Sequence, residues 1–276
     1  MILSHVGFNH AGSAYPLWYS LAAAAAVCGA GLVYWAIWLM TLGASEPNSA
    51  GQSRQPPSRK TDDADEFAAD RQSMVDRQLR ARDIDDPEVL AAFNRVPRHR
   101  FVPPILQHLA YADEPLPIGH AQTISQPYVV ALMTQLAKPK RHGRALDVGV
   151  GSGYQTAVLA ELCDEVYGIE IIGPLAEAAS RRLAELGYKN VEVRTGDGYR
   201  GWPEHAPFDC IIVAAAADHV PQPLIDQLAP GGRLVLPVGH GWQELAVIEK
   251  QDDGSVRRLD YGPVAFVPMT GEAERK

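Results

Sequence analysis

Cysteine is scarce in this chain: only three occur among its 276 residues, Cys28, Cys163 and Cys210. They lie far apart in the sequence, so they show neither the spacing of a metal site nor a disulfide framework. Each lies among apolar neighbours and is expected to be a small residue of a core or of a membrane segment. We therefore expect no metal site, and the cysteine usage is consistent with a reducing compartment.

Positive charge is also in short supply, with 25 Lys and Arg against 33 Asp and Glu and a formal net charge of −8. This balance argues against a general nucleic-acid-binding surface, and we expect no nucleic acid as a partner. No internal repeat is visible. The length suffices for one α/β domain of about 200 residues with a real core, together with an appendage.

The N-terminal part lacks charged residues altogether between Tyr15 and Ala44. A helix of about 20 residues crosses the hydrocarbon layer of a membrane, so this run is long enough to span it. We expect a transmembrane helix over about residues 16–43. Aromatic residues suited to the membrane interface stand near its two ends: Trp18 and Tyr19, and Tyr34, Trp35 and Trp38.

A cleaved signal peptide followed by export is the alternative, because Leu42-Gly43-Ala44 resembles a small-residue cleavage site. Two features favour a retained anchor: the apolar region exceeds the usual length of about 7–15 residues, and no Lys or Arg precedes it. Basic residues appear only after the span, at Arg54, Arg59 and Lys60. The positive-inside rule therefore places the C-terminal part on the cytoplasmic face of the membrane.

The segment after the span is rich in Ser, Pro, Gln and Asp and has hardly an apolar side chain. Such a composition is typical of a flexible tether. The sequence thus predicts three parts: an N-terminal segment over residues 1–44 that contains the membrane helix, a linker over 45–64, and a folded domain over 65–276.

A glycine-rich turn stands between an apolar run and a helical pattern at residues 144–154. Gly149, Gly151 and Gly153 lack a Cβ atom, so the turn can adopt positive φ and its backbone can approach a ligand closely. The helix that follows points its unpaired N–H groups at the same place. This pattern predicts a site for a nucleotide-type cofactor, with a purely structural turn as the alternative.

Acidic residues around this turn separate two classes of cofactor. A dinucleotide fold requires G-x-G-x-x-G, whereas this chain has G-x-G-x-G and an acid, Asp147, that would repel a pyrophosphate. S-adenosyl-L-methionine (AdoMet) carries an ammonium group, a ribose and an adenine but no phosphate, and we expect it here. A second apolar run ends at Glu170, where a ribose diol would be held. Asp197, between Gly196 and Gly198, is expected to accept a hydrogen bond from the adenine amino group, with an Asx turn as the alternative.

Strands and helices alternate through the rest of the domain. This order predicts an α/β fold with a doubly wound, mostly parallel sheet, helices on both faces, and the ligand at the carboxyl ends of the strands. A helix around residues 74–84, a second one opened by Asp86-Pro87, a loop over 115–127 and a helix over about 128–137 precede the sheet. The expected core elements are 144–149, 154–162, 165–170, 174–186, 190–194, 209–214, 222–228, 232–237 and 244–249.

Five segments of the domain carry a resemblance to a known family: residues 123–127, 147–155, 196–198 with Gly201-Trp202, 206–209 and 231–239. Together they resemble protein-L-isoaspartate O-methyltransferases, over about residues 74–271. The resemblance implies a Rossmann-like class I methyltransferase fold. It also implies methyl transfer from AdoMet to the α-carboxylate of L-isoaspartyl residues in damaged proteins, which initiates repair through a succinimide.

This resemblance also implies roles for particular residues. Ser125 is the active-site serine, beside Gln122, Thr123 and Ile124 in the substrate-binding loop. The implied partners are isoaspartyl proteins or peptides, and we expect a monomer. The cofactor-binding residues are Asp147, Gly149, Gly151, Ser152, Gly153, Glu170, Asp197 and Gly198.

The residues alone leave a structural alternative for the serine loop. Thr123 and Ser125 can cap the helix that begins near Pro127, because Ser and Thr are favoured N-cap residues. His120 is expected to be a loop residue rather than a general base, since transfer to an ionised carboxylate needs no base.

Four positions depart from the usual pattern of the family: Ala121 stands where glycine is common, Val150 and Ala214 where threonine is common, and Ala265 in place of a basic residue. AdoMet binding is still expected, whereas the lost cation bears on the docking of a carboxylate-bearing peptide. Two further functions are compatible with the same cofactor: a small-molecule carboxyl methyltransferase, and a catalytically silent AdoMet-binding adaptor tethered to the membrane.

Overall fold

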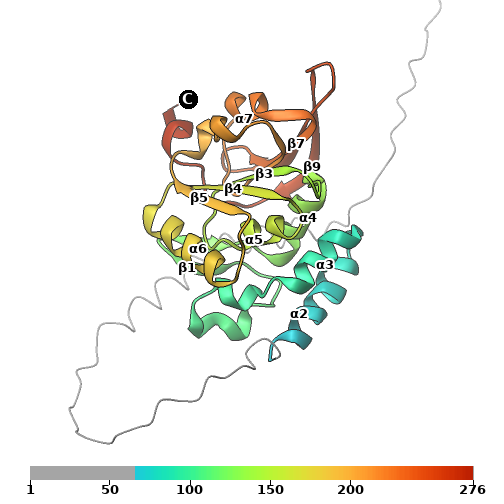
Figure 1. Cartoon of the computed structure of the whole chain (residues 1–276), viewed down its shortest axis with the longest axis vertical. Helices are drawn as coiled ribbons and strands as arrows, with labels where there is room; N and C mark the ends of the chain where they lie inside the picture. The colour runs from blue at the N-terminus through green and yellow to red at the C-terminus, as the bar shows by residue number, and fades with distance from the viewer. Residues whose placement is uncertain (1–65, 276) are drawn as a thin grey trace, which may run out of the picture. The chain divides into compact units, whose positions relative to one another are not determined.

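A seven-stranded sheet runs through the part of the chain that the computed structural model describes, residues 66–275 (Figure 1). Its strand order is β5-β4-β3-β6-β7-β8-β9, in which the first five strands are parallel and β8 is antiparallel to both of its neighbours. The predicted α/β fold with a mostly parallel sheet is confirmed. The strands are β3 (Arg144–Val148), β4 (Glu165–Glu170), β5 (Val191–Thr195), β6 (Phe208–Val213), β7 (Leu228–Val238), β8 (Gln243–Lys250) and β9 (Val256–Val264).

The central strands formed where apolar runs predicted them, because a parallel strand covered on both faces needs apolar residues at nearly every position. In β3, Ala145 and Leu146 are completely buried and Val148 is nearly so. The edge strand β9 was not predicted. Most of its side chains are exposed and it pairs only with β8, so its sequence carries no apolar run to reveal it.

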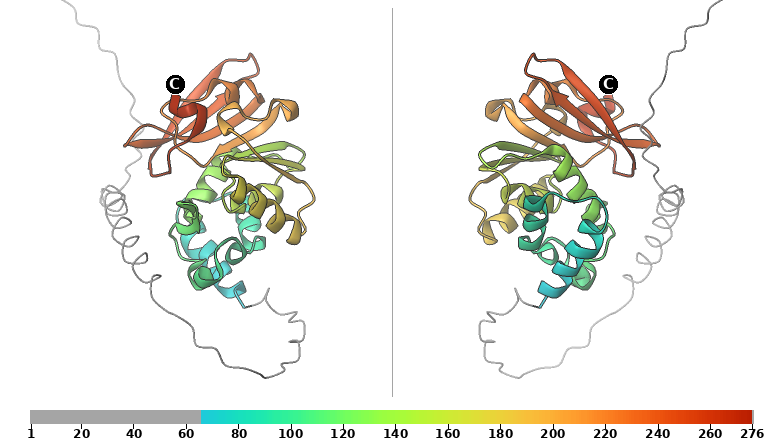
Figure 2. Two further views of the ribbon diagram at one scale, coloured as in Figure 1. Left: turned by 90° about the vertical axis from the view of Figure 1, so that its left-hand side faces the viewer. Right: turned by 90° about the vertical axis from the view of Figure 1, so that its right-hand side faces the viewer.

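Helices lie on both faces of the sheet, as predicted, but unequally (Figure 2). One face carries the long helices, which pack with the N-terminal helices into one apolar cluster. The other face carries one short helix and several 3₁₀ turns around a second cluster. The first group is α4 (Pro127–Ala137), α5 (Tyr154–Ala160) and α6 (Gly173–Glu185), and the second is α7 (Gln222–Asp226), η4 (Gly198–Arg200), η5 (Pro203–His205) and η6 (Gly271–Arg275).

The N-terminal helices differ in part from the prediction. α2 (Ala68–Met74) continues into a π-helix, η1 (Val75–Arg80), so the first helix starts earlier and ends earlier than expected. α3 (Pro87–Arg95) begins as predicted, because the Asp86 side chain accepts hydrogen bonds from the next free backbone N–H groups. Two 3₁₀ turns follow, η2 (Arg98–Phe101) and η3 (Pro104–Leu109).

The segment predicted as a loop over residues 115–127 instead holds a two-stranded antiparallel hairpin. β1 (Leu116–Gly119) pairs with β2 (Gln122–Ile124). The turn between them has positive φ at Gly119, His120 and Ala121. Pro117 within β1 is tolerated because a two-stranded sheet leaves each strand one free edge. The hairpin ends just before α4 and so determines where Ser125 lies.

Within residues 66–275, the helices are too short or too polar to cross a membrane. The predicted span over residues 16–43 and the linker over 45–64 lie outside the described residues.

The start of α3 provides a test of local stability. Asp86 Oδ1 accepts hydrogen bonds from Glu88 N at 2.9 Å and from Val89 N at 3.2 Å. We expect Asp86→Ala to lower the free energy of unfolding by about 0.5–2 kcal/mol, because it leaves N-terminal donors of the helix without this partner. Chemical denaturation of the purified protein measures it. Asp85→Ala is the matched control, since the exposed Asp85 side chain caps nothing, and an equal loss in both variants would contradict the capping role.

Candidate active site

Three of the predicted cofactor segments meet at one edge of the sheet. The glycine-rich turn follows β3, Glu170 ends β4, and Asp197 follows β5. These strands are neighbours in register, with Val148 opposite Ile169 and Glu170 opposite Thr195. Their carboxyl ends therefore deliver all three segments to the same place, as expected for a parallel α/β sheet.

The glycine-rich turn has the backbone conformation that its composition predicts. Gly149, Gly151 and Gly153 have φ of 87°, 52° and 89°, values that residues with a Cβ atom rarely adopt. Gly149 N donates to Ile169 O at 2.8 Å, which ties the turn to the end of β4. Ser152 Oγ accepts from Tyr154 N at 3.3 Å, so this predicted cofactor residue supports the start of α5.

The Glu170 carboxylate holds the turn directly. One oxygen accepts from Gly151 N at 2.8 Å and the other from Ile172 N at 2.9 Å, and the residue is only 5% exposed. Each carboxylate oxygen has a further lone pair, so the group can still accept hydrogen bonds from a ligand. Beside it, Ile171 is 42% exposed and offers an apolar surface that the sequence analysis did not identify.

Asp147 lies beneath the turn and is completely buried. Its Oδ2 accepts a hydrogen bond from Thr156 Oγ1 at 2.5 Å, whereas Oδ1 has no partner within the described residues. Burial raises the pKa of the Asp147 carboxyl from 3.8 to about 7; the Thr156 hydrogen bond opposes this shift and the charge of Glu170 adds to it. The carboxyl of Asp147 is therefore divided between its neutral and ionised forms near pH 7.

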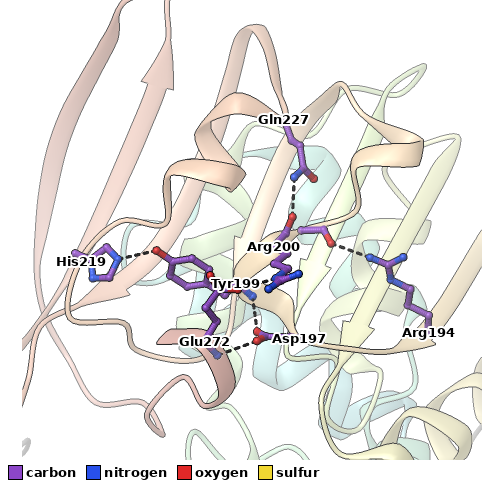
Figure 3. A network of polar contacts seen from close by, with 8 residues as sticks. Arg194, Asp197, Tyr199, Arg200, His219, Gln227 and Glu272 are labelled. Carbon is purple, nitrogen blue, oxygen red and sulfur yellow. Dashed lines mark hydrogen bonds and ion pairs between the residues drawn. The ribbon is translucent and has the colours of Figure 1, made fainter. Parts of the chain in front are cut away.

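Asp197 forms the Asx turn that was the alternative for this residue. Its Oδ1 accepts from Tyr199 N at 3.0 Å, and Oδ2 accepts from Glu272 N at 2.8 Å. Arg200 Nε donates to Glu272 Oε2 at 2.6 Å, so the C-terminal turn η6 is attached beside Asp197 (Figure 3). This contact with Glu272 had no signal in the sequence.

Gly198 has a packing role. A Cβ atom at this position would lie 2.3 Å from Val148 Cγ1, so only glycine lets η4 pack against β3. Two further contacts hold the turn η4 (Figure 3). Gln227 Nε2 donates to Arg200 O at 2.8 Å, and Tyr199 OH lies 2.9 Å from His219 Nε2. Packing within the described residues thus accounts for the glycine at position 198, without a role in ligand binding.

The hydroxyl of Ser125 makes no hydrogen bond to any residue between 66 and 275. The capping alternative for this loop is wrong, because α4 has Gln126 as its N-cap residue and no cap from that residue's own side chain. Instead Asp113 approaches the helix start, accepting from Tyr128 N at 3.4 Å and from Gln126 Nε2 at 2.8 Å. The serine hydroxyl is therefore available to a ligand.

The neighbours of Ser125 divide into two groups. Thr123 is exposed and Gln122 is half-buried, so both can reach a substrate, whereas the Ile124 side chain is 3% exposed and belongs to the core. The hairpin lies against the glycine turn, since Ile118 Cδ1 is 3.4 Å from where a Cβ atom on Gly151 would be. The hairpin that carries the predicted substrate loop therefore lies beside the predicted cofactor loop through Ile118.

The structure describes the surroundings of three departures from the family pattern and explains the one at Val150. Ala121 has φ of 56°, a conformation that favours the glycine common there. Val150 is buried, and its Cγ2 lies 2.6 Å from where a Cβ atom on Gly168 would be, so glycine in β4 makes room for it. Ala265 is exposed.

Comparisons with known proteins agree with this geometry. The family model of protein-L-isoaspartate(D-aspartate) O-methyltransferase matches residues 69–274. A protein-L-isoaspartate O-methyltransferase from Opitutus terrae is 57% identical over 205 residues, 74% of this chain and 88% of the relative. One from Gloeobacter violaceus is 55% identical over 72% of this chain and 98% of the relative.

A solved structure gives the same result at the level of the fold. The enzyme of this name from Plasmodium falciparum, in complex with S-adenosyl-L-homocysteine, has a TM-score of 0.64 at 28% identity and covers 72% of this chain and 98% of its own. The chain belongs to the protein-L-isoaspartate(D-aspartate) O-methyltransferase family and is an AdoMet-dependent methyltransferase of that class.

Proposed function

We propose that this protein transfers a methyl group from AdoMet to the α-carboxylate of L-isoaspartyl residues in damaged proteins. The observation that carries this function is the family match over residues 69–274, almost the whole of the described part. The methyl ester then loses methanol as the neighbouring backbone nitrogen closes a succinimide, and hydrolysis of that ring returns some normal aspartate. The methylation step is thus the start of a repair.

The residues at the carboxyl edge of the sheet fit the cofactor. When bound, AdoMet supplies a methyl group on a positively charged sulfur that is a good leaving group. Glu170 retains free lone pairs for the ribose hydroxyls, Asp197 does the same for the adenine amino group, and the exposed side chain of Ile171 suits the flat face of the base. The orphaned oxygen of Asp147 provides a negative charge beneath the turn, where it favours a ligand ammonium group.

The substrate side of the site needs only to bind and orient a carboxylate. A carboxylate with an ordinary pKa near 4 is already ionised at neutral pH, so no general base is required. The chain's contribution is to hold the carboxylate in line with the methyl group and to exclude water. We assign the orienting hydrogen bond to the Ser125 hydroxyl, with Thr123 and Gln122 beside it. His120 is exposed at the hairpin turn and is left without a role in proton transfer.

Methyl transfer to synthetic peptides tests this function and the role of Ser125 together. Wild-type protein is expected to release labelled methanol from an isoaspartyl peptide and not from the matched aspartyl peptide. Ser125→Ala should reduce kcat about ten- to a hundredfold, because one hydrogen bond to a charged group, worth about 1.5–3 kcal/mol, is lost. Affinity for S-adenosyl-L-homocysteine and the unfolding midpoint should change little, since the hydroxyl caps nothing.

Ser180→Ala, on the exposed face of α6, is the matched control and should behave as wild type. A wild-type rate in Ser125→Ala would remove Ser125 from the site. Activity only on small carboxylic acids would support the small-molecule alternative. Cofactor binding without any methyl transfer would support the silent adaptor.

The raised pKa of Asp147 predicts a pH-dependent affinity for AdoMet. A ligand ammonium group favours the ionised carboxylate, so binding below about pH 7 should release a proton and tighten as the pH rises from about 6 to 8. The stability of the ligand-free protein should show the opposite trend with pH. The folded state binds the Asp147 proton more tightly than the unfolded state does, so the free energy of unfolding falls as the pH rises from about 4 to 7. Calorimetry in buffers of different ionisation enthalpy measures the proton release.

Asp147→Asn should lose both trends, while Asp252→Asn, at the exposed turn before β9, should keep them. AdoMet's own amino group titrates nearby, so the difference between these two variants is the decisive quantity. Equal pH profiles in both would show that Asp147 is not coupled to the ligand.

We also propose that residues 1–44 anchor the protein in the membrane, that 45–64 form a tether, and that the enzyme domain, 65–276, faces the cytoplasm as a monomer. The support is the uncharged run from Tyr15 to Ala44 with basic residues only after it. Fractionation of cells should find the full chain in the membrane pellet. A salt wash should not release it, whereas detergent should release it as a monomer. A mature chain beginning near Ser45 in an exported fraction would overturn the anchor.

A further inference from the structure

Arg98 is a buried cation without an acidic partner. Its side chain is 0% exposed and is the largest by volume of the completely buried side chains in residues 66–275. No carboxylate of that range forms an ion pair with it; Asp113 is the acidic residue whose charge acts on it. Burial lowers the pKa of the Arg98 guanidinium to about 10, which still leaves it charged at neutral pH. An apolar side chain would fill this space without the cost of burying a charge.

The guanidinium instead donates hydrogen bonds to backbone carbonyl groups of different segments. Nε donates to Ala110 O at 2.8 Å, at the end of η3. Nη2 donates to Ser125 O at 2.8 Å and, more weakly, to Glu114 O at 3.5 Å. The planar fork of arginine presents several N–H groups in fixed directions, which a lysine ammonium group does not. Arg98 therefore connects the Ser125 backbone to the end of η3.

The same side chain also contacts the cofactor side. Its Cζ lies 4.9 Å from the centre of the Tyr154 ring, and Tyr154 is the first residue of α5, directly after the glycine turn. The bond from Arg98 to Ser125 uses the backbone carbonyl, so the serine hydroxyl can still bind another group.

We propose that Arg98 is the positioning residue for Ser125, holding its backbone so that the hydroxyl meets the substrate carboxylate opposite the glycine turn. This inference rests on the proposed role of Ser125. Arg98 does not touch the substrate and acts only through the serine loop. Displacement of a reacting group by about 1 Å can reduce the rate about a hundredfold, so the loss of this clamp affects turnover more than binding.

A double-mutant cycle tests the inference. The wild type, Arg98→Lys, Ser125→Ala and the double variant are compared for kcat and KM on the isoaspartyl peptide, and for S-adenosyl-L-homocysteine affinity by calorimetry. We expect Arg98→Lys to lower kcat about tenfold or more and to leave the affinity within about threefold of wild type. The double variant should be no slower than Ser125→Ala, because a residue that acts through Ser125 has no further effect once the hydroxyl is gone.

Arg100→Lys is the matched control: it lies two positions further along in η2, is exposed, and should retain wild-type kcat. Losses that multiply in the double variant would mean that Arg98 acts independently of Ser125 and would overturn the inference, as would a wild-type kcat in Arg98→Lys. A parallel loss of cofactor affinity would show a general structural role instead.

Two outcomes keep this test separate from the proposed function. A slow Ser125→Ala with a fast Arg98→Lys contradicts only the positioning role, whereas a fast Ser125→Ala contradicts the proposed role of the serine and the inference with it. Should Arg98→Lys fail to fold, Arg98→Gln repeats the cycle with a neutral side chain that still carries an N–H donor for the Ser125 carbonyl. The same non-additive result is then required.

Discussion

The site depends on the pair of hydrogen bonds that the Glu170 carboxylate accepts from Gly151 N and Ile172 N. They connect the end of β4 to the glycine turn after β3, and the Gly149 N to Ile169 O bond makes the same connection through the backbone. A turn built from glycines has many accessible conformations, so it needs such fixed acceptors to hold one of them. Both the cofactor surface and the contact with the Ile118 hairpin rest on that one conformation.

Buried charge is concentrated where the chemistry is proposed. Arg98, Asp147 and Glu170 are all buried, and none of them forms an ion pair within residues 66–275, whereas the buried Arg233 pairs with Glu249 at 3.2 Å. Unpaired buried charges reduce stability, so their presence together argues for a purpose other than folding. Hydrogen bonds hold these side chains in place: Arg98 and Glu170 bind backbone groups, and Asp147 binds the Thr156 hydroxyl.

The elements with strong periodic signals were predictable. The bounds of β4 and the starts of α3 and α5 agree with the sequence analysis, because a buried strand, a capped proline and a glycine turn are each encoded within a few residues. The β1–β2 hairpin and β9 were missed for opposite reasons. The hairpin contains Pro117 and two non-glycine residues with positive φ, a conformation that costs about 1–2 kcal/mol per residue, and β9 lacks an apolar run.

The sequence by itself determined the class of fold, the cofactor and the family, because glycine spacing, acid positions and motif residues are local patterns. It also predicted Ser125, Glu170 and Asp197 as residues of the site. Only the tertiary structure decided what those residues touch. Neither the bond from Arg98 to Ser125 nor the one from Glu272 to Asp197 follows from spacing, since 27 and 75 positions separate the partners. Such contacts depend on how helices and strands pack, which no local pattern encodes.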